Sequence, residues 1–215
     1  MEFREPLSVS NKFKAYLPSL ALAAVISAGA VIALAPPSSA PAVAAAAAPA
    51  WTVDKAASSL GFDALEADTG QPFKGVFNKW DAKIAFDPAN LAGSSVAVTV
   101  DVSAMKSDFD DATESFPWPE WMNAASFPNA TFTSASFKDL GGGKYEADGV
   151  LKIKGVERQL VLPFTLAIAG DTAKMNGSLD LDRTTFSVGT GKWAGDDFIG
   201  KKVTVQVAVT AKRAA

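Results

Sequence analysis

The stretch from Lys144 to Ala167 constrains the fold more than any other part of this 215-residue chain, because it alternates polar and apolar residues on both sides of a glycine. A period of two is the pattern of a β-strand with one buried face. Gly155-Val156 suits the centre of a type II′ turn, since glycine accepts the positive φ of its first position. The stretch therefore predicts two antiparallel strands of about ten residues, roughly 33 Å long. Strands of this kind curl into a barrel or pack on a second sheet.

The predicted turn also decides which side chains face one another across the two strands. Four apolar pairs share one face: Tyr145 with Leu166, Ala147 with Phe164, Gly149 with Leu162, and Leu151 with Leu160. The opposite face is mostly polar and begins with Lys154 and Glu157. A slip of one residue would turn the leucines toward water, so the pattern specifies the register strongly.

The same period recurs along most of the chain after Trp51. The clearest further strands are Val76–Phe86, Val96–Val102, Met175–Leu181 and Val203–Val209, and the weaker ones are Ser58–Glu66 and Thr131–Lys138. About eight long strands without a long helix favour an all-β sandwich or barrel, and about eight close into a barrel that holds side chains or one small ligand. The apolar faces mix small and bulky residues, which suits a packed core as well as a lined cavity.

One segment, Asp108–Asn123, breaks the period. Asp108 or Asp110 suits the N-cap of a short helix, and Pro119 suits the first turn of a second one. We therefore expect one or two short helices over one end of the strands. The apolar residues of this segment that either cover a barrel mouth or seal the core are Trp118, Trp121 and Met122.

Residues 1–50 differ from the rest of the chain. A basic start precedes the apolar run Ala15–Leu34, and a Pro/Ala/Ser-rich stretch follows it. This order is typical of a secretory signal, and the small residues at Ala42-Val43-Ala44 predict a cut after residue 44 with a spacer to residue 50. The apolar run is also close to the length that spans a bilayer, so a retained membrane anchor is the alternative. Both readings export residues 51–215, to the periplasm or to its inner-membrane face.

The composition excludes several kinds of site. The chain contains no cysteine and no histidine, so it has no disulfide framework, no thiol nucleophile and no histidine base or ligand. Its net charge of −3 argues against a nucleic-acid-binding protein, for which a basic face is expected. The acidic residues Asp108, Asp110, Asp111 and Glu114 lack the spacing of an EF-hand, and a solvated helix start explains them better than a calcium site.

A second polar group lies at the end of a predicted strand. Alternation places Asp180 and Asp182 on the polar face, which favours a surface cluster over an acid–base pair. Arg183 falls on the apolar side, where a buried cation needs a partner. Either it pairs with an aspartate of the helical segment, or it contacts the head group of a ligand.

Several groups of residues, in this order and at these spacings, resemble the YceI-like, polyisoprenoid-binding family. They are Trp51–Asp54, Phe73–Phe77 through Ile84–Pro88, Ser126–Ser134, Gly149–Gly155 with Leu162–Phe164, and Arg183–Gly189. The resemblance covers residues 51–213. It implies an extended, lipocalin-like antiparallel barrel of eight strands whose apolar tunnel takes an isoprenoid chain. Two departures, Lys154 in place of a common histidine and Ser187 in place of a common glycine, affect polar contacts at strand ends.

The resemblance and the apolar strand faces together predict an exported lipid-binding protein that carries or sequesters a polyprenyl lipid or a quinone tail. No cofactor and no catalytic residue are expected, and a homodimer is expected only by analogy with the family. The alternatives are an enzyme without histidine that acts on a lipophilic substrate, and a structural or interaction barrel with a filled core.

The alternation also predicts the ligand contacts. The residues expected to line the tunnel are Phe62, Trp80, Ile84, Val98, Gly149, Leu151, Leu160, Leu162, Phe164, Leu179 and Val205, with Trp118, Trp121 and Met122 over the mouth and Arg183 at a strand end. Since Gly149 is expected to face Leu162, a leucine at position 149 is predicted to project into the bore and block it.

Overall fold

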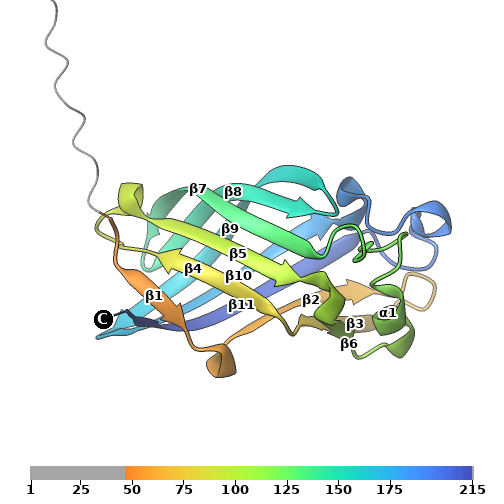
Figure 1. The fold of residues 1–215 in the computed structure, drawn as a ribbon, viewed down its shortest axis with the longest axis horizontal. Coiled ribbons are helices and arrows are strands. Elements are labelled where there is room, and N and C mark those ends of the chain that lie inside the picture. The colour runs from red at the N-terminus through yellow and green to blue at the C-terminus, as the bar shows by residue number, and fades with distance from the viewer. Residues whose placement is uncertain (1–46, 215) are drawn as a thin grey trace, which may run out of the picture. The chain divides into compact units, whose positions relative to one another are not determined.

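The computed structural model describes residues 47–214, which form a β-barrel with very little helix (Figure 1). Five of the strands are long and continuous: β7 (Asn129–Gly141), β8 (Lys144–Ile153), β9 (Val156–Ala169), β10 (Thr172–Asp182) and β11 (Lys202–Arg213). Each pairs antiparallel with the next one along the chain. These strands form one half of the barrel wall, which we call the continuous half.

The other half of the wall is made of three strands that are each split in two, and we call it the split half. Its pieces are β1 (Ala50–Val53), β2 (Ser59–Leu65), β3 (Pro72–Phe77), β4 (Trp80–Ala85), β5 (Ser95–Asp101) and β6 (Met105–Ser107). Both β1 and β2 pair with β11, β4 pairs with β1 and β5, and β3 pairs with β2 and β6. Each split pair therefore occupies the place of one strand. With β5 paired to β7, the prediction of a closed eight-stranded antiparallel barrel is confirmed.

The central hairpin differs from its predicted register by two residues. Lys154 and Gly155 both have positive φ, 50° and 79°, so this pair forms the turn, as in a type I′ hairpin. Gly149 consequently lies opposite Leu160 and not opposite Leu162. The Lys154 side chain holds this backbone through hydrogen bonds from Nζ to the carbonyl oxygens of Glu120 (3.3 Å) and Ser187 (2.8 Å). A shift of two residues preserves the faces, so the apolar face was predicted correctly.

The alternation predicted for Val76–Phe86 fails at one point. The chain leaves the strand at Asn78 and Lys79, between β3 and β4, and the inward-facing positions change from odd to even numbers there. Phe77 faces inward, whereas Val76 is 46% exposed, contrary to the prediction.

The one α-helix in residues 47–214, α1 (Asp110–Ser115), lies over one end of the barrel, beside β3 and β6 (Figure 1). Its N-cap is Phe109, without a side-chain cap, because Asp108 accepts a hydrogen bond from the backbone N–H of Lys74 instead. The second helix predicted around Pro119 is a set of turns. The predicted leader and its cleavage point lie outside the described residues. Within residues 47–214, no helix is long and apolar enough to cross a membrane.

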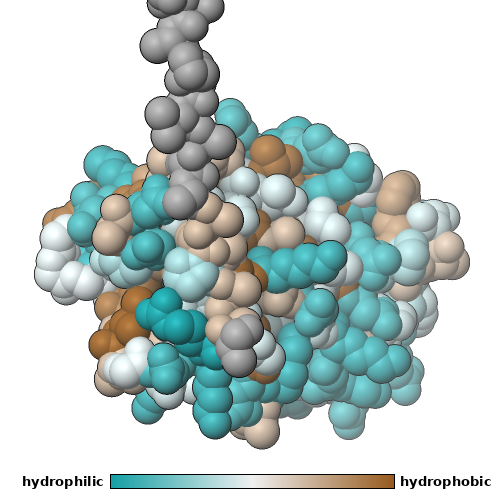
Figure 2. Space-filling view, turned by 60° about the vertical axis from the view of Figure 1, so that its left-hand side comes forward, coloured by the Kyte–Doolittle hydropathy of each residue, from teal (hydrophilic) through white to brown (hydrophobic). Residues whose placement is uncertain are grey.

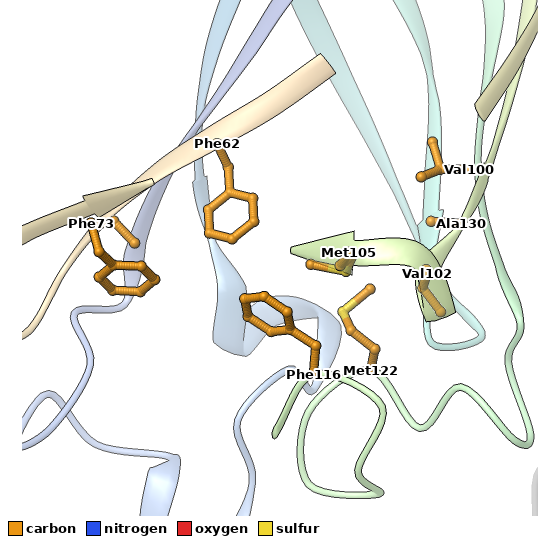
Figure 3. Packing of buried hydrophobic residues seen from close by; sticks show 9 residues of the cluster. Phe62, Phe73, Val100, Val102, Met105, Phe116, Met122 and Ala130 are labelled. Atoms are coloured by element: carbon orange, nitrogen blue, oxygen red, sulfur yellow. The ribbon is translucent and has the colours of Figure 1, made fainter. Parts of the chain in front are cut away.

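Two clusters of buried side chains occupy the two ends of the barrel. The cluster at the α1 end, which we call the plug, contains Phe62, Phe73, Met105, Phe116 and Met122 together with four smaller residues (Figure 3). The cluster at the opposite end contains Trp51, Phe86, Tyr145, Phe164 and three alanines. The β1 strand and the last residues of β11 lie at this second end, which we call the β1 end (Figure 1).

Candidate functional site: an apolar tunnel

Inward-facing side chains of the barrel surround a cavity of about 230 Å³. Its wall takes residues from every strand of the barrel except the short β6, and Thr131 is its sole polar residue. Many of these side chains, such as Val98, Leu160 and Leu179, are partly accessible although they point inward. Side chains packed against one another in a filled core would be buried, so this pattern indicates open space.

The structure places nine of the predicted contact residues on the cavity wall. They are Trp80, Ile84, Val98, Leu151, Leu160, Leu162, Phe164, Leu179 and Val205. The wall also contains aromatic residues that were not predicted as contacts, namely Trp51, Phe77, Phe86, Phe132 and Phe137. Trp51 belongs to a strand of only four residues, Phe77 is the last residue of β3, and Phe137 follows a bulge in β7 that shifts the register between Ser134 and Ser136.

Phe62 was predicted to line the cavity, but the structure does not place it on the wall. Its ring packs in the plug against Phe73, Phe77 and Phe116, with centroid distances of 6.3, 5.7 and 5.8 Å. Phe62 also covers Gly75 on the neighbouring strand, where a Cβ atom would collide with the ring. The residue points inward, but it closes the α1 end of the barrel.

Gly149 does not line the cavity either. The ring of Phe132 covers it, and an added Cβ atom would lie 2.5 Å from that ring and 2.6 Å from the carbonyl oxygen of Thr133. A larger residue would therefore strain the sheet before it reached the bore. Gly149→Leu is consequently a test of wall packing, not of tunnel blockage as predicted.

The three residues predicted to cover the mouth have separate positions, and none of them lines the tunnel. Met122 belongs to the plug. Trp121 is buried against Trp193, with ring centroids 5.6 Å apart. Trp118 is 48% exposed. Met122 therefore helps to seal the α1 end, which was the alternative to a lid.

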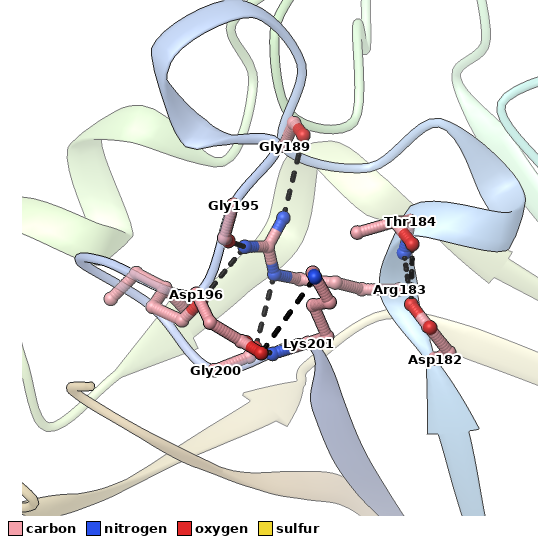
Figure 4. Close-up of polar contacts among 9 residues, drawn as sticks. Asp182, Arg183, Thr184, Gly189, Gly195, Asp196, Gly200 and Lys201 are labelled. Carbon is pink, nitrogen blue, oxygen red and sulfur yellow. Dashed lines mark hydrogen bonds and ion pairs between the residues drawn. The ribbon is translucent and has the colours of Figure 1, made fainter.

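Arg183 is buried and acts as the hub of a loop, contrary to its predicted role as a ligand contact (Figure 4). Its guanidinium group donates hydrogen bonds to five carbonyl oxygens, those of Val188, Gly189, Gly195, Ile199 and Gly200, at 2.8–3.4 Å. A guanidinium has five N–H donors, so none is left for a head group. No aspartate of the helical segment pairs with it in the described residues, contrary to the other alternative. Burial lowers the pKa of Arg183, and the charges of Asp196 and Asp182 oppose that shift.

The cavity reaches the β1 end of the barrel. The wall includes six of the seven residues of the cluster there, the exception being Tyr145, whose pKa is raised by desolvation and by Asp139. Ile168 is also on the wall and is 37% exposed. The outer surface on this side is mostly hydrophilic, with hydrophobic residues showing between (Figure 2). The plug contributes only Val100 and Ala130 to the wall, so the cavity stops short of the α1 end and extends toward the β1 end.

A seam runs across the split half, because its three breaks lie side by side. The backbone N–H of Asn78 donates to the carbonyl oxygen of Ala104, and that of Asp101 donates to Lys79. Lys55 closes the seam from outside. Its Nζ atom lies 3.5 Å from the ring centroid of Trp80 and donates to the Trp80 carbonyl oxygen at 2.6 Å. The Trp80 ring, which is part of the tunnel wall, thus carries a cation on one face. No pattern in the sequence predicted this role for Lys55.

The cavity wall carries no ionisable side chain. Across residues 47–214, no group of three or more acidic residues is arranged to hold a metal ion. An apolar, uncharged tunnel can bury hydrocarbon.

The family model described as the YceI-like domain matches residues 51–211. The chain belongs to the YceI-like family. The resemblance seen in the sequence is therefore confirmed.

Curated relatives of this YceI-like chain are UPF0312 proteins. One from Vibrio cholerae is 35% identical over 89 residues, which are 41% of this chain and 47% of that protein. One from Vibrio vulnificus is 28% identical over 147 residues, 68% of this chain and 75% of that protein. The first match thus spans about half the length of the relative.

Solved structures agree with the YceI-like fold. BcnA of Burkholderia cenocepacia has a TM-score of 0.70 and 30% identity, covering 74% of this chain and 99% of that one. A polyisoprenoid binding domain from Saccharophagus degradans, implicated in plant cell wall breakdown, has a TM-score of 0.61 and covers 77% of this chain and 99% of that one. At 14% identity, the second likeness shows the fold alone.

Proposed function

We propose that this YceI-like protein is an exported lipid-binding protein that holds an isoprenoid chain, of a polyprenyl lipid or a quinone tail, for carriage or sequestration. The observation that carries the proposal is the tunnel, whose wall is apolar along its length and free of ionisable groups. Each CH₂ group buried there would contribute about 0.8 kcal/mol. A flexible hydrocarbon chain uses such a wall fully, whereas a polar ligand would leave its hydrogen bonds unpaired.

The polyisoprenoid binding domain of Saccharophagus degradans supports the same ligand class through its shared fold. The apolar wall argues against an enzyme, because the alternative of a histidine-free enzyme required an ionisable group inside the tunnel. The open volume argues against a barrel filled by its own side chains.

Organic extraction of the purified protein followed by mass spectrometry tests the ligand class. We expect an isoprenoid lipid, or uptake of added quinone by the extracted protein. Finding neither would overturn the proposal.

Ala82→Phe tests the location of the ligand. Ala82 is on the tunnel wall, and the added phenyl ring would occupy the bore. Ala97, on the outer face of neighbouring β5, is exposed, so Ala97→Phe is the matched control. We expect Ala82→Phe to lose most of its lipid while Ala97→Phe keeps it, with strand content unchanged by circular dichroism. Equal loads in both variants would show that the lipid binds elsewhere.

Export remains part of the proposal. Cell fractionation and N-terminal sequencing of the purified protein distinguish a cut after residue 44, which gives a periplasmic protein, from a retained anchor at the inner membrane. Light scattering tests the homodimer, which stays a prediction.

A further inference from the structure

The ladder of the barrel wall is incomplete between β9 and β10. These strands pair with each other only over residues 164–169 and 172–177, although β9 begins at Val156 and β10 ends at Asp182. On their other sides both strands stay paired, β9 with β8 over residues 156–165 and β10 with β11 over residues 172–182. Residues 156–163 and 178–182 therefore form two edges with no ladder between them, and we call the space between these edges the window.

Pro163 explains where the pairing stops. The pair next to a two-residue turn exchanges both hydrogen bonds, so Val156 and every second residue after it bond to β8. The residues between them direct their backbone groups toward β10, and Pro163 is one of these. Proline has no N–H, so the ladder loses a hydrogen bond at this point.

The inner side of the window is part of the tunnel. Leu160 and Leu162 on one edge and Leu179 and Leu181 on the other all belong to the tunnel wall, and all four are partly accessible. If the ladder continued in register, Leu162 would face Leu179 and Leu160 would face Leu181. A ligand in the tunnel consequently lies beside the window.

The window is bounded at both ends. At one end the last pair of the ladder is Phe164 with Gly177. At the other end Lys154, in the turn before β9, donates from Nζ to the carbonyl oxygen of Ser187, just beyond β10, at 2.8 Å. The two edges are therefore held near each other on either side of the window.

The window offers polar groups that the tunnel wall lacks. By the same alternation, the backbone groups of Glu157, Gln159 and Val161 point toward β10, but these residues lie beyond the last pair of the ladder. Backbone N–H groups are strong donors that need acceptors. An oxygen atom of a ligand at the window would accept hydrogen bonds from them.

Arg158 lies on the same edge. It shares a face of the sheet with Leu160 and lies opposite Leu151, both on the tunnel wall, yet its own side chain is exposed. Its Nη1 atom donates to the carbonyl oxygen of Glu157 at 2.9 Å, and it forms no ion pair within residues 47–214. A guanidinium has five N–H donors, so several remain for an oxygen from outside the chain.

We propose that the window holds the polar head group of the lipid, while the isoprenoid tail lies along the tunnel toward the β1 end. The head-group oxygens accept hydrogen bonds from the backbone of β9 and from Arg158. This inference rests on the proposed function, and it adds the place and the chemistry of the head group. A quinone and a phosphate share this chemistry, because both present acceptor oxygens that the apolar wall would leave unpaired. Passage of the tail through the wall is a separate step, for which the split half has the shorter ladders.

A single fluorescent label locates the head group, since the chain contains no cysteine. Gln159→Cys and Ala167→Cys, each labelled with a small thiol-reactive fluorophore, lie on the exposed outer face of β9, the first beside the window and the second near the β1 end. A quinone ring quenches a fluorophore that it contacts. We expect ubiquinone with a two-unit tail to quench the label at position 159 and not the label at position 167.

The opposite result, or equal quenching at both positions, would place the head group elsewhere and overturn the proposal. Quinone bound to the same samples is measured by organic extraction. Bound quinone without quenching at position 159 would overturn this inference alone, whereas the absence of any bound lipid would overturn the proposed function and the inference with it.

Arg158→Gln tests the chemistry of the contact. The ligands are ubiquinone and an isoprenyl phosphate, with an isoprenoid hydrocarbon that has no head group for comparison. We expect the variant to bind the phosphate about tenfold more weakly, because that hydrogen bond is charge-assisted, or the quinone several-fold more weakly, and the hydrocarbon unchanged. The ligand that loses affinity identifies the head group. Lys174→Gln, on the outer face of β10 where the ladder is complete, is the matched control and should change none of the three affinities.

Unchanged binding of both head-group ligands by Arg158→Gln would overturn the proposal. So would an equal loss for the hydrocarbon, which would indicate a general change in the tunnel. Melting temperatures of all variants establish that they are folded.

Discussion

The two halves of the barrel wall are built differently, although they span the same length. The continuous half consists of five strands of 10–14 residues joined by tight turns. The split half covers the same length with pieces of 3–7 residues, interrupted at one level by turns and a kink. Ladders that run nearly the whole length of the strands hold most of the first half, although β9 and β10 pair only over residues 164–169 and 172–177, whereas side chains such as Lys55 close the gaps in the second.

This difference separates stability from access. Regions with fewer ladder hydrogen bonds open at lower free-energy cost than continuous strands do. We therefore expect the continuous half to keep the shape of the tunnel, and the split half to open first when a ligand enters or leaves. The following predictions test that division.

The largest effect is expected at the hub that joins the halves. The loop held by Arg183 also pairs with the split half, since the N–H of Gly200 donates to the carbonyl oxygen of Leu65. Arg183→Met would remove the donor from five carbonyl oxygens that are buried or partly buried, so we expect a loss of about 3–5 kcal/mol in the free energy of unfolding. Urea unfolding measures this loss. Arg183→Lys should recover only part of it, because one ammonium cannot replace a five-donor fork. Full recovery by lysine would show that charge alone matters.

A smaller loss is expected within the continuous half, at Gly149. The Cβ of a leucine would press on Phe132 and on the carbonyl oxygen of Thr133, a backbone atom that cannot turn away. We expect Gly149→Leu to cost about 1–3 kcal/mol. Val161→Leu, on the exposed outer face of the same hairpin, is the control and should change stability by less than about 0.5 kcal/mol. Unchanged stability with a lost lipid load would restore the original prediction that a leucine enters the bore.

The two halves also differ in how well the sequence predicted them. Alternation identified the continuous strands and their apolar face, because a period of two persists over ten residues or more. In the split half the period restarts after Asn78-Lys79, so Val76 was placed on the wrong side. The turn at Lys154-Gly155 was missed because a lysine with positive φ depends on partners 33 and 34 residues away.

In the candidate site too, the sequence predicted what depends on local strand direction and missed what depends on distant contacts. The strand pattern located the wall positions of the tunnel, since inward direction is a local property of a strand. It could not separate the cavity wall from the plug, as Phe62 shows, because that depends on which distant rings meet. The role of Arg183 was missed for the same reason, because its partners are carbonyl groups of a loop without a sequence signature.

Lys55→Met tests whether the seam controls access. The ammonium of Lys55 holds the Trp80 ring and lies 3.7 Å from Asp81. These contacts are partly exposed, so stability should fall by less than about 1 kcal/mol. Exchange of a bound fluorescent lipid should nevertheless become several-fold faster, because the Trp80 ring, no longer held by Lys55, moves away from the seam more often. The amount of lipid bound at equilibrium should change little. Lys83 lies on the outer face of β4, the strand that contains Trp80, and Lys83→Met should leave the exchange rate unchanged. Equal exchange rates in both variants would place the entry route elsewhere.

The smallest expected effect is on stability at low pH. Each half contains one aspartate with the same hydrogen-bonding arrangement. The carboxylate of Asp101, in the split half, accepts hydrogen bonds from the N–H and hydroxyl of Ser103, and that of Asp182, in the continuous half, accepts the same two from Thr184. The side-chain hydrogen bond is the main reason why the pKa of each aspartate is lowered.

A carboxyl group with a lowered pKa in the folded state stabilises the fold fully above its unfolded value of about 3.9, and this contribution disappears as the pH falls below that value. Asp101→Asn and Asp182→Asn should therefore change stability little at pH 7, since asparagine caps a helical turn about as well as aspartate. Below a pH of about 4 each variant should lose stability less steeply than the unmodified protein. Urea unfolding over this pH range measures the slopes. At Asp182 the charges of Lys201 and Arg183 add to the hydrogen bonds and burial opposes them, and at Asp101 the charge of Lys79 adds to the hydrogen bonds against a similar opposition. A slope unchanged in both variants would mean that neither half draws its acid sensitivity from these turns.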